Sequence, residues 1–128
     1  MIVKDVNQVS RNPRISQEFR INAQIREYDI ENIVIDLGSN VNLMSKKTWE
    51  IMGKPKLVWS PIAFKMANQQ KIVPFGRLES VCIDIEGIRS TTNFEVIEIL
   101  DGNLHFPAFL GLEWAFENLS LVNLKRNS

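Results

Sequence analysis

The sequence predicts a mainly β protein, and three features indicate it. Apolar and polar residues alternate strictly along residues 19–26, which is the pattern of a strand with one face in a core. Short apolar runs recur along the chain between polar or glycine-containing turns, as they do in hairpins. Only residues 46–52 and 113–119 have the pattern of helices, and both segments are short. We therefore expect short strands arranged in hairpins, together with two short helices.

Length and composition indicate one domain. At 128 residues, of which 45% are hydrophobic, the chain can form one ordinary core. We expect that domain to span residues 17–126. Residues 1–16 carry little pattern and indicate a linker or N-terminal arm, and residues 127–128 form a tail.

Charge and cysteine content argue against several function classes. Fifteen basic and fifteen acidic residues cancel, so no basic excess favours nucleic-acid binding. The single cysteine, Cys82, excludes an internal disulfide and fits a reducing compartment. With one histidine, His105, a zinc site of cysteine and histidine is not expected. No apolar run reaches membrane-spanning length and no signal-peptide pattern is found. We expect a cytoplasmic protein without membrane contact, or a piece of a larger polyprotein.

The strand at residues 30–35 is expected to return from the first strand through a polar turn. Its last three residues, 33–35, are all β-branched, which indicates a strand buried on both faces. Asp36 follows directly, and residues 38–40 then form a turn that can hold backbone at positive φ. A carboxylate at the end of a buried strand is held in place and partly removed from water, which suits acid–base chemistry. For this motif by itself, the alternative is an aspartate that simply ends a strand.

A short helix and a protruding hairpin are expected next. Ser45 can cap a helix over residues 46–52, and Gly53 can end it. Residues 62–66 and 71–75 then flank a polar tip, which is typical of a hairpin that projects from the body of the protein.

The second half of the chain is expected to contain a long hairpin and a final helix and strand. Residues 78–86 and 89–99 form two strands around a Glu-Gly turn. An apolar strand at residues 109–111 ends at a glycine, residues 113–119 form one or two helical turns, and residues 121–124 form the last strand.

Three motifs occur along the chain in an order that matches a known family. The first is Asp36-Leu37-Gly38-Ser39, the second is the hairpin tip Ala67, Asn68, Gln69 and Gln70, and the third is the run Phe-Leu-Gly-Leu-Glu-Trp at residues 109–114. Together they resemble a retropepsin, the aspartic protease of retroviruses and long-terminal-repeat retrotransposons, and are most similar to the plant Ty3/gypsy-type domains. That family has Asp-Thr/Ser-Gly-Ala/Ser, a flap, and an apolar-apolar-Gly segment in these places. The resemblance covers residues 19–126.

The resemblance implies a fold, an activity and a set of site residues. The fold is a single-lobe closed β-barrel with a flap hairpin, and the activity is that of a homodimeric aspartic endopeptidase acting on a polyprotein without cofactor or metal. Each subunit gives one catalytic aspartate, Asp36. Two such carboxylates share one proton, the charged one activates a water, and the protonated one hydrogen-bonds the scissile carbonyl. In the family's pattern Leu37, Gly38 and Ser39 form the active-site loop, Leu110 and Gly111 support it, and Ala67, Asn68, Gln69 and Gln70 contact the substrate.

Two departures from the family pattern keep a second hypothesis open. Leu37 replaces the usual Thr or Ser, whose hydroxyl bonds across the dimer axis, and the flap tip at residues 67–70 lacks glycine. The alternative is a catalytically inactive retropepsin-like module for dimerisation or peptide binding. We expect self-association through the Asp36 loops and the terminal strand at residues 121–124, and a protein that stays monomeric would favour the inactive module.

Overall fold

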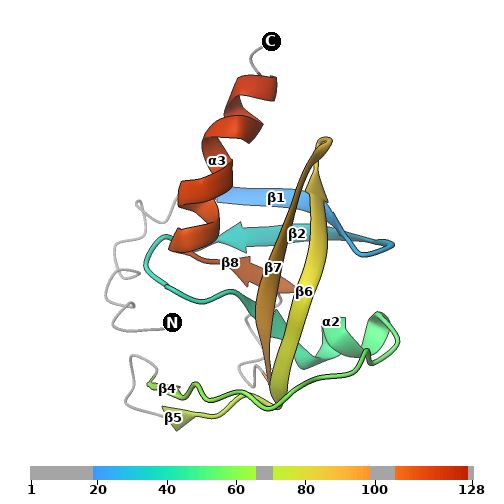
Figure 1. Cartoon of the computed structure of the whole chain (residues 1–128), viewed down its shortest axis with the longest axis vertical. Helices are drawn as coiled ribbons and strands as arrows, with labels where there is room; N and C mark the ends of the chain where they lie inside the picture. Colours follow the sequence, from blue (N-terminus) through green and yellow to red (C-terminus); the bar gives the residue numbers. More distant parts are fainter. Residues whose placement is uncertain (1–18, 66–70, 99–105, 127–128) are drawn as a thin grey trace.

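Six strands form a closed barrel, in the order β1-β2-β8-β3-β7-β6, in the computed structural model (Figure 1). The structure describes residues 19–65, 71–98 and 106–126. In chain order, the elements of these residues are β1 (Phe19–Ile25), β2 (Tyr28–Ile35), β3 (Leu43–Ser45), α2 (Lys46–Ile51), β4 (Phe64–Lys65), β5 (Lys71–Ile72), β6 (Gly76–Ile85), β7 (Ile88–Ile97), β8 (Ala108–Leu110) and α3 (Leu112–Arg126). The expected mainly β architecture is therefore confirmed. The expected arm at residues 1–16, the flap tip, the loop at 101–103 and the tail lie outside the described residues.

The first hairpin, β1–β2, supplies one wall of the barrel. Ile21, Ala23 and Ile25 alternate with exposed polar residues along β1 and are all buried, as the sequence pattern predicts. The ladder contains a bulge, where Asn32 has a φ of 64°. Its backbone N–H donates to the side-chain oxygen of Asn22 at 3.1 Å, which replaces the ladder bond lost at the bulge.

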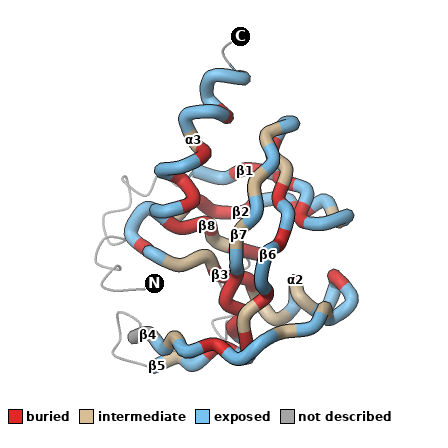
Figure 2. Tube along the Cα trace, viewed as in Figure 1, coloured by how far each residue is buried: buried red, intermediate tan, exposed pale blue. Residues whose placement is uncertain are grey.

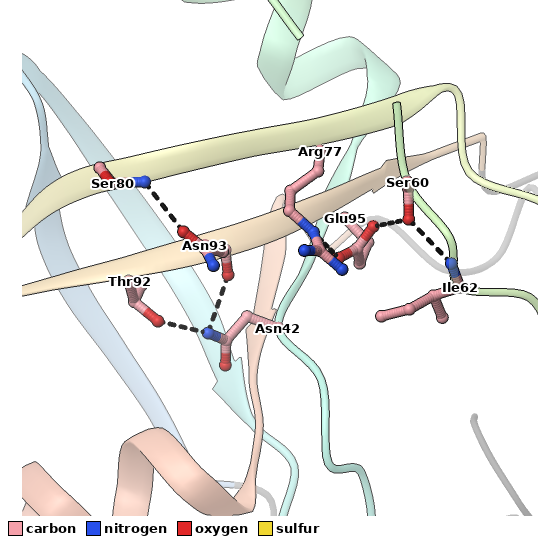
Figure 3. A network of polar contacts seen from close by, with 8 residues as sticks. All are labelled: Asn42, Ser60, Ile62, Arg77, Ser80, Thr92, Asn93 and Glu95. Atoms are coloured by element: carbon pink, nitrogen blue, oxygen red, sulfur yellow. Dashed lines mark hydrogen bonds and ion pairs between the residues drawn. The ribbon is translucent and has the colours of Figure 1, made fainter. Parts of the chain in front are cut away.

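The second hairpin, β6–β7, also contains a bulge whose N–H is bound by an asparagine side chain. It turns at Glu86 and Gly87, both with positive φ, where the sequence predicts a turn. A bulge falls between Leu78 and Val81, and Ser80 there has a φ of 55°. The N–H of Ser80 donates to the side chain of Asn93 on β7 at 2.9 Å (Figure 3). Both hairpins therefore bend at a bulge whose free N–H is bound by an asparagine.

The core fills the interior of the barrel, and buried positions recur along every barrel strand (Figure 2). The β-branched end of β2 is buried throughout, with Ile33, Val34 and Ile35 at 0%, 5% and 4% exposure. Burial on both faces is thus confirmed for residues 33–35, the end of β2 that leads to Asp36. The largest fully buried side chains are Phe94, Ile25, Ile33, Met44, Ile83, Ile85, Leu110, Val96 and Val122.

The helix after β3 begins as the sequence predicts. The side-chain oxygen of Ser45 accepts from the backbone N–H of Thr48 at 3.0 Å, which is an N-cap bond. The helix α2 gives way to a turn at Met52 and Gly53, where Gly53 has a φ of 89° that suits glycine.

The C-terminal segment differs from the prediction. Residues 112–126 form one continuous helix, α3, so the helix expected at 113–119 is present but longer than predicted, and the final strand expected at 121–124 is wrong. The segment contains no glycine or proline to end a helix, and its buried residues Trp114, Ala115, Asn118 and Val122 have helical spacing. Trp114 fixes this face against the barrel, because its ring N–H donates to the hydroxyl of Ser90 on β7 at 3.2 Å. The apolar pattern at 121–124 therefore belongs to a helix.

Two features of the topology position the candidate site. The strand β8 lies between β2 and β3, which are neighbours in sequence, and pairs in parallel with β2 and antiparallel with β3. The loop from β2 to β3 must therefore pass over the end of β8. Separately, β4 and β5 pair as a two-stranded hairpin outside the barrel, where the sequence predicts the projecting hairpin (Figure 1).

Candidate active site

Asp36 directly follows β2, and both its backbone N–H and its backbone carbonyl are hydrogen-bonded. Its N–H donates to the carbonyl of Leu110 at 2.8 Å, which continues the parallel pairing of β2 with β8. Its own carbonyl accepts from Ser39 N–H at 3.2 Å, which closes the turn. The side-chain oxygen Oδ1 accepts from Gly38 N–H at 3.0 Å, and the residue is half-buried. The carboxylate is thus oriented by its own loop while it remains accessible to water and to a second group.

Ser39 holds the inner side of this turn. Its hydroxyl donates to the carbonyl of Val41 at 3.0 Å, the N–H of Val41 is 3.2 Å from the same oxygen, and Ser39 is 3% exposed. Residues 38–40 could hold positive φ, but none of them does so in the structure. The turn is instead closed by side-chain and main-chain bonds of Asp36 and Ser39, which ordinary backbone conformations permit.

Gly111 is the point where the β8 end touches the Asp36 loop. A Cβ on Gly111 would lie 2.7 Å from the carbonyl oxygens of both Ser39 and Val41, a distance that side chains do not tolerate. The next residue, Leu112, donates its N–H to the Ser39 carbonyl at 2.7 Å. Leu110, directly before, is fully buried. The structure therefore brings Leu110 and Gly111 against the Asp36 loop, where the resemblance places them.

Asn42 is a site residue that the sequence analysis missed. Its side-chain oxygen accepts from Gly111 N–H at 2.8 Å, and its amide nitrogen donates to the Thr92 hydroxyl at 2.8 Å and to the Asn93 carbonyl at 3.0 Å (Figure 3). One side chain thus joins the Asp36 loop to both β8 and β7. In the sequence it is a polar residue between Val41 and Leu43, at the point where a loop becomes a strand, and that position was the only available signal.

Leu37 turns away from the core. It is 48% exposed, although it directly follows the buried strand and the half-buried Asp36. Nearby, Asn40, Leu112, Glu113 and Phe116 line an open and largely apolar groove where α3 begins. Leu112 and Phe116 are 43% and 86% exposed, so apolar side chains gather at the surface beside the Asp36 loop.

The structure describes the two short strands of the flap hairpin, β4 and β5. Phe64 pairs with Ile72 and Lys65 with Lys71. The four predicted flap residues, Ala67, Asn68, Gln69 and Gln70, lie outside the described residues. In Figure 1 the hairpin lies on the same side of the view as the loop that follows β2.

The β6–β7 turn contains a carboxyl group with a shifted pKa. Asp84, near the β6–β7 turn, accepts from Gly87 N–H at 2.9 Å and from Arg89 at 3.1 Å. These two bonds, the backbone bond first, lower the pKa of the Asp84 carboxyl from its usual value of 3.8. Since Arg89 and Asp84 are cross-strand partners at a hairpin turn, we interpret this pair as a structural feature of the hairpin.

Two further properties concern the described part of the chain. No group of three His, Cys, Asp or Glu side chains there is placed to hold a metal ion. No helix there is long and apolar enough to cross a bilayer. Cys82 is free and exposed on β6, and His105 lies outside the described residues.

Solved structures of two proteins share this architecture. The retroviral protease-like domain of Ddi1 from Leishmania major superposes with a TM-score of 0.57 at 20% identity, over 80% of this chain and 76% of that one. The EIAV protease complexed with the inhibitor HBY-793 superposes with a TM-score of 0.62 at 11% identity, over 80% and 89%. The fold is retropepsin-like. No family model and no curated protein matches the sequence.

The predicted fold, a single-lobe closed barrel, is therefore confirmed. The described residues also contain the expected hairpin outside the barrel and two helices. The second helix, α3, is longer than expected. Within this retropepsin-like barrel, five predicted site residues lie together at the crossing of the β2–β3 loop with β8, namely Asp36, Gly38, Ser39, Leu110 and Gly111.

Proposed function

We propose that this chain is an aspartic endopeptidase domain that acts as a homodimer, with Asp36 as one of the two catalytic carboxylates. The observation that carries the proposal is the position of Asp36 within the retropepsin-like fold. Its carboxylate is oriented by Gly38 N–H, stands at the exit of a buried strand and remains partly exposed.

The chemistry requires a second carboxylate. Two carboxylates a few ångströms apart share one proton because both cannot ionise readily. The charged member takes a proton from a water, whose oxygen attacks the peptide carbonyl, while the protonated member hydrogen-bonds the carbonyl oxygen. Collapse of the tetrahedral species breaks the C–N bond and passes a proton to the leaving amine. Of the described aspartates, Asp29 and Asp84 lie at hairpin turns and Asp36 alone ends a buried strand. A second copy of the chain supplies the missing group.

Exposed apolar side chains beside Asp36 support this dimer. Leu37 adjoins the aspartate, and Leu112 and Phe116 line the groove at the start of α3. Exposed apolar surface next to a half-complete site favours burial against a partner. The terminal strand expected at residues 121–124 is part of α3. We therefore propose that the partner meets the Asp36 loop and the first turns of α3, where these exposed apolar side chains lie.

We propose a peptide segment of a polyprotein as the substrate, held between the Asp36 loops and the flap residues Ala67, Asn68, Gln69 and Gln70. The motif at residues 36–39 and the run at 109–114 favour a retrotransposon polyprotein in the cytoplasm, a compartment that the free Cys82 fits. The mechanism uses water and two carboxylates, and it needs no cofactor, metal, nucleic acid or membrane.

Cleavage of a mixed peptide library at about pH 4 to 7 tests the proposal, because this range spans carboxylate titration. We expect cleavage by the purified chain, inhibition by pepstatin, and no cleavage by Asp36→Asn. Asp29→Asn is the matched control, since Asp29 is an exposed aspartate at the other end of the same strand and its loss should leave cleavage unchanged. Equal cleavage by Asp36→Asn and the wild type would overturn the assignment.

An inactive dimerisation or peptide-binding module is the second candidate, and Leu37 is the observation that favours it. Leu cannot make the cross-axis hydroxyl bond that the family's Thr or Ser makes, and it is exposed rather than packed. A chain that self-associates and binds library peptides without cleaving them at any pH in this range would establish this second function instead.

A further inference from the structure

A buried carboxylate lies at the base of the flap hairpin. Glu95, on β7, is 3% exposed. Its Oε1 accepts from the Ser60 hydroxyl at 2.6 Å and its Oε2 accepts from the Arg77 guanidinium at 2.7 Å (Figure 3). A carboxylate is expensive to bury, and here both of its oxygens are bound by good donors.

The two donors lie on the two segments that flank the flap hairpin, residues 57–60 before β4 and residues 76–77 after β5, which we call its roots. Ser60 lies four residues before β4, on the chain entering the hairpin, and its hydroxyl also accepts from Ile62 N–H at 3.2 Å. Arg77 lies five residues after β5, on the chain leaving it. The roots also bond directly, because Val58 and Arg77 exchange N–H to carbonyl bonds of 2.9 and 2.8 Å.

The two roots are closely packed at Gly76. A Cβ on Gly76 would lie 2.8 Å from Leu57 Cβ and 3.0 Å from the Val58 carbonyl oxygen, so only glycine fits there. The entering and leaving chains are therefore closely packed next to β4 and β5, and Glu95 bonds to both of them.

The main chain of Glu95 reaches the Asp36 loop. Its N–H donates to the Asn42 carbonyl at 2.9 Å, and Leu43 is its cross-strand partner on β3. Asn42 in turn accepts from Gly111 N–H, directly under the Asp36 loop. Glu95 is thus bonded through its side chain to the flap roots and through its backbone to the segment that returns from the candidate catalytic aspartate.

We propose that Glu95 is a positioning residue that fixes the flap hairpin relative to the Asp36 loop. An apolar residue could fill this site at similar stability, but it would not fix the position of either root. With the carboxylate present, any shift of Ser60 or Arg77 leaves a buried charge short of a partner, so one arrangement of the hairpin is selected. The consequence for peptide binding rests on the proposed function, whereas the fixing of the roots does not.

The β6–β7 hairpin offers a matched control. Arg77 with Glu95, and Asp84 with Arg89, are both directly opposed arginine–acid pairs on the same two strands. The first pair contacts the flap roots, while the second lies near the β6–β7 turn. Glu95→Gln and Asp84→Asn each remove one charge with little change of shape, so their difference isolates the effect on the flap roots.

Amide hydrogen exchange measures that difference without any activity. For Glu95→Gln we expect exchange at Val58 and Arg77 N–H to accelerate about tenfold or more, which corresponds to the loss of one charged hydrogen bond. Exchange at Asp36 N–H, which is bonded to Leu110, should change by less than about twofold in that variant. Asp84→Asn should leave all three amides within about twofold of the wild type.

Arg77→Lys provides a second variant if Glu95→Gln does not fold. It keeps the charge and loses the planar guanidinium geometry, so it should accelerate the Val58 amide in the same direction. With a cleaved peptide as substrate, Glu95→Gln should raise KM about tenfold and change kcat little. Equal acceleration of all amides would show a general stability role and overturn the proposal, as would unchanged exchange at Val58 and Arg77. Faster exchange at Val58 and Arg77 with an unchanged KM would support the role of Glu95 in fixing the flap roots but would overturn its role in peptide binding.

Discussion

The side-chain oxygen of Asn42 accepts a 2.8 Å hydrogen bond from the backbone N–H of Gly111. These two residues come from segments that are far apart in the sequence and that cross beside Asp36. The bond therefore holds the loop that follows β2 to the end of β8, and its loss should loosen the candidate site at its crossing point.

Asn42→Ala should destabilise the fold by about 2 kcal/mol. The change removes three hydrogen bonds and leaves the Gly111 N–H and the Asn93 carbonyl without this partner. Asn40→Ala is the matched control, because Asn40 is an exposed asparagine of the same loop and its change should stay within about 0.5 kcal/mol. Urea denaturation of both variants measures the difference. Similar midpoints for the two variants would contradict the role given to Asn42.

The sequence predicted much of the fold because its strands carry strong periodic patterns. Residues 19–25 alternate between apolar and polar, and residues 33–35 are all β-branched, and both patterns are typical of strands. The prediction of a strand at residues 121–124 was wrong because the pattern there is ambiguous. Leu121, Val122 and Leu124 fit a short strand as well as a helix, and the long-range contact of Trp114 with Ser90 on β7, which sequence periodicity does not contain, favours the helix.

The Glu95 cluster shows a second limit of sequence analysis. Counted from the β6–β7 turn, where Ile85 faces Ile88, the register would pair Arg77 with Val96. The bulge at Ser80 shifts the ladder by one residue and brings Arg77 opposite Glu95. Because the position of a bulge is set by tertiary packing, the charged pair could not be predicted from charge and spacing alone.

Gly111→Ala should destabilise the protein by at least about 2 kcal/mol. The new methyl group would lie 2.7 Å from two backbone oxygens, those of Ser39 and Val41, and neither can move without opening the Asp36 loop. Gly38→Ala provides the comparison, because its methyl group would be 3.4 Å from the Asp36 carboxylate, an ordinary contact, and Gly38 does not have positive φ. We expect Gly38→Ala to cost less than about 1 kcal/mol in thermal unfolding. The reverse order of the two melting temperatures would argue against this packing.

Asp84 should stabilise the folded protein in a pH-dependent way. Gly87 N–H and Arg89 lower its pKa in the folded state below 3.8, so the folded protein binds the proton less readily than the unfolded chain. The stabilisation is therefore fully present above the unfolded pKa and is lost as the pH falls through the lowered folded pKa. Asp84→Asn should be less stable than the wild type near pH 6, and the difference should shrink as the pH falls below 3.8. A gap in unfolding free energy that is constant over this range would contradict the pKa assignment.

Phe116→Gln should weaken self-association about tenfold or more while leaving the monomer folded. Phe116 is 86% exposed and lines the groove beside Asn40, so its apolar surface is available to a partner. Leu124→Gln is the control on the same helix, because Leu124 is 66% exposed and lies two turns further from the Asp36 loop. Sedimentation equilibrium distinguishes the two variants. Weaker association of Leu124→Gln alone would place the interface at the C-terminal end of α3.

Leu37→Thr should raise both self-association and peptidase activity. The substitution restores the hydroxyl that resembles the family's cross-axis donor, and two such bonds per dimer could contribute about 2 kcal/mol, or roughly thirtyfold in dimer affinity. Leu37 is 48% exposed in the single chain, so its replacement opens no cavity in the barrel, but the apolar surface that it would bury against the partner is lost and offsets part of this gain.

Leu37→Ala is the matched control for that substitution, since it removes the same bulk without adding a hydroxyl. We expect the gain to be largest at low protein concentration, where dimerisation limits activity. Measuring cleavage rate against protein concentration for the wild type, Leu37→Thr and Leu37→Ala separates the two contributions. An equal gain in Leu37→Ala would assign the effect to bulk. No gain in Leu37→Thr would show that leucine is accommodated at the dimer axis and that the missing hydroxyl does not limit this protein.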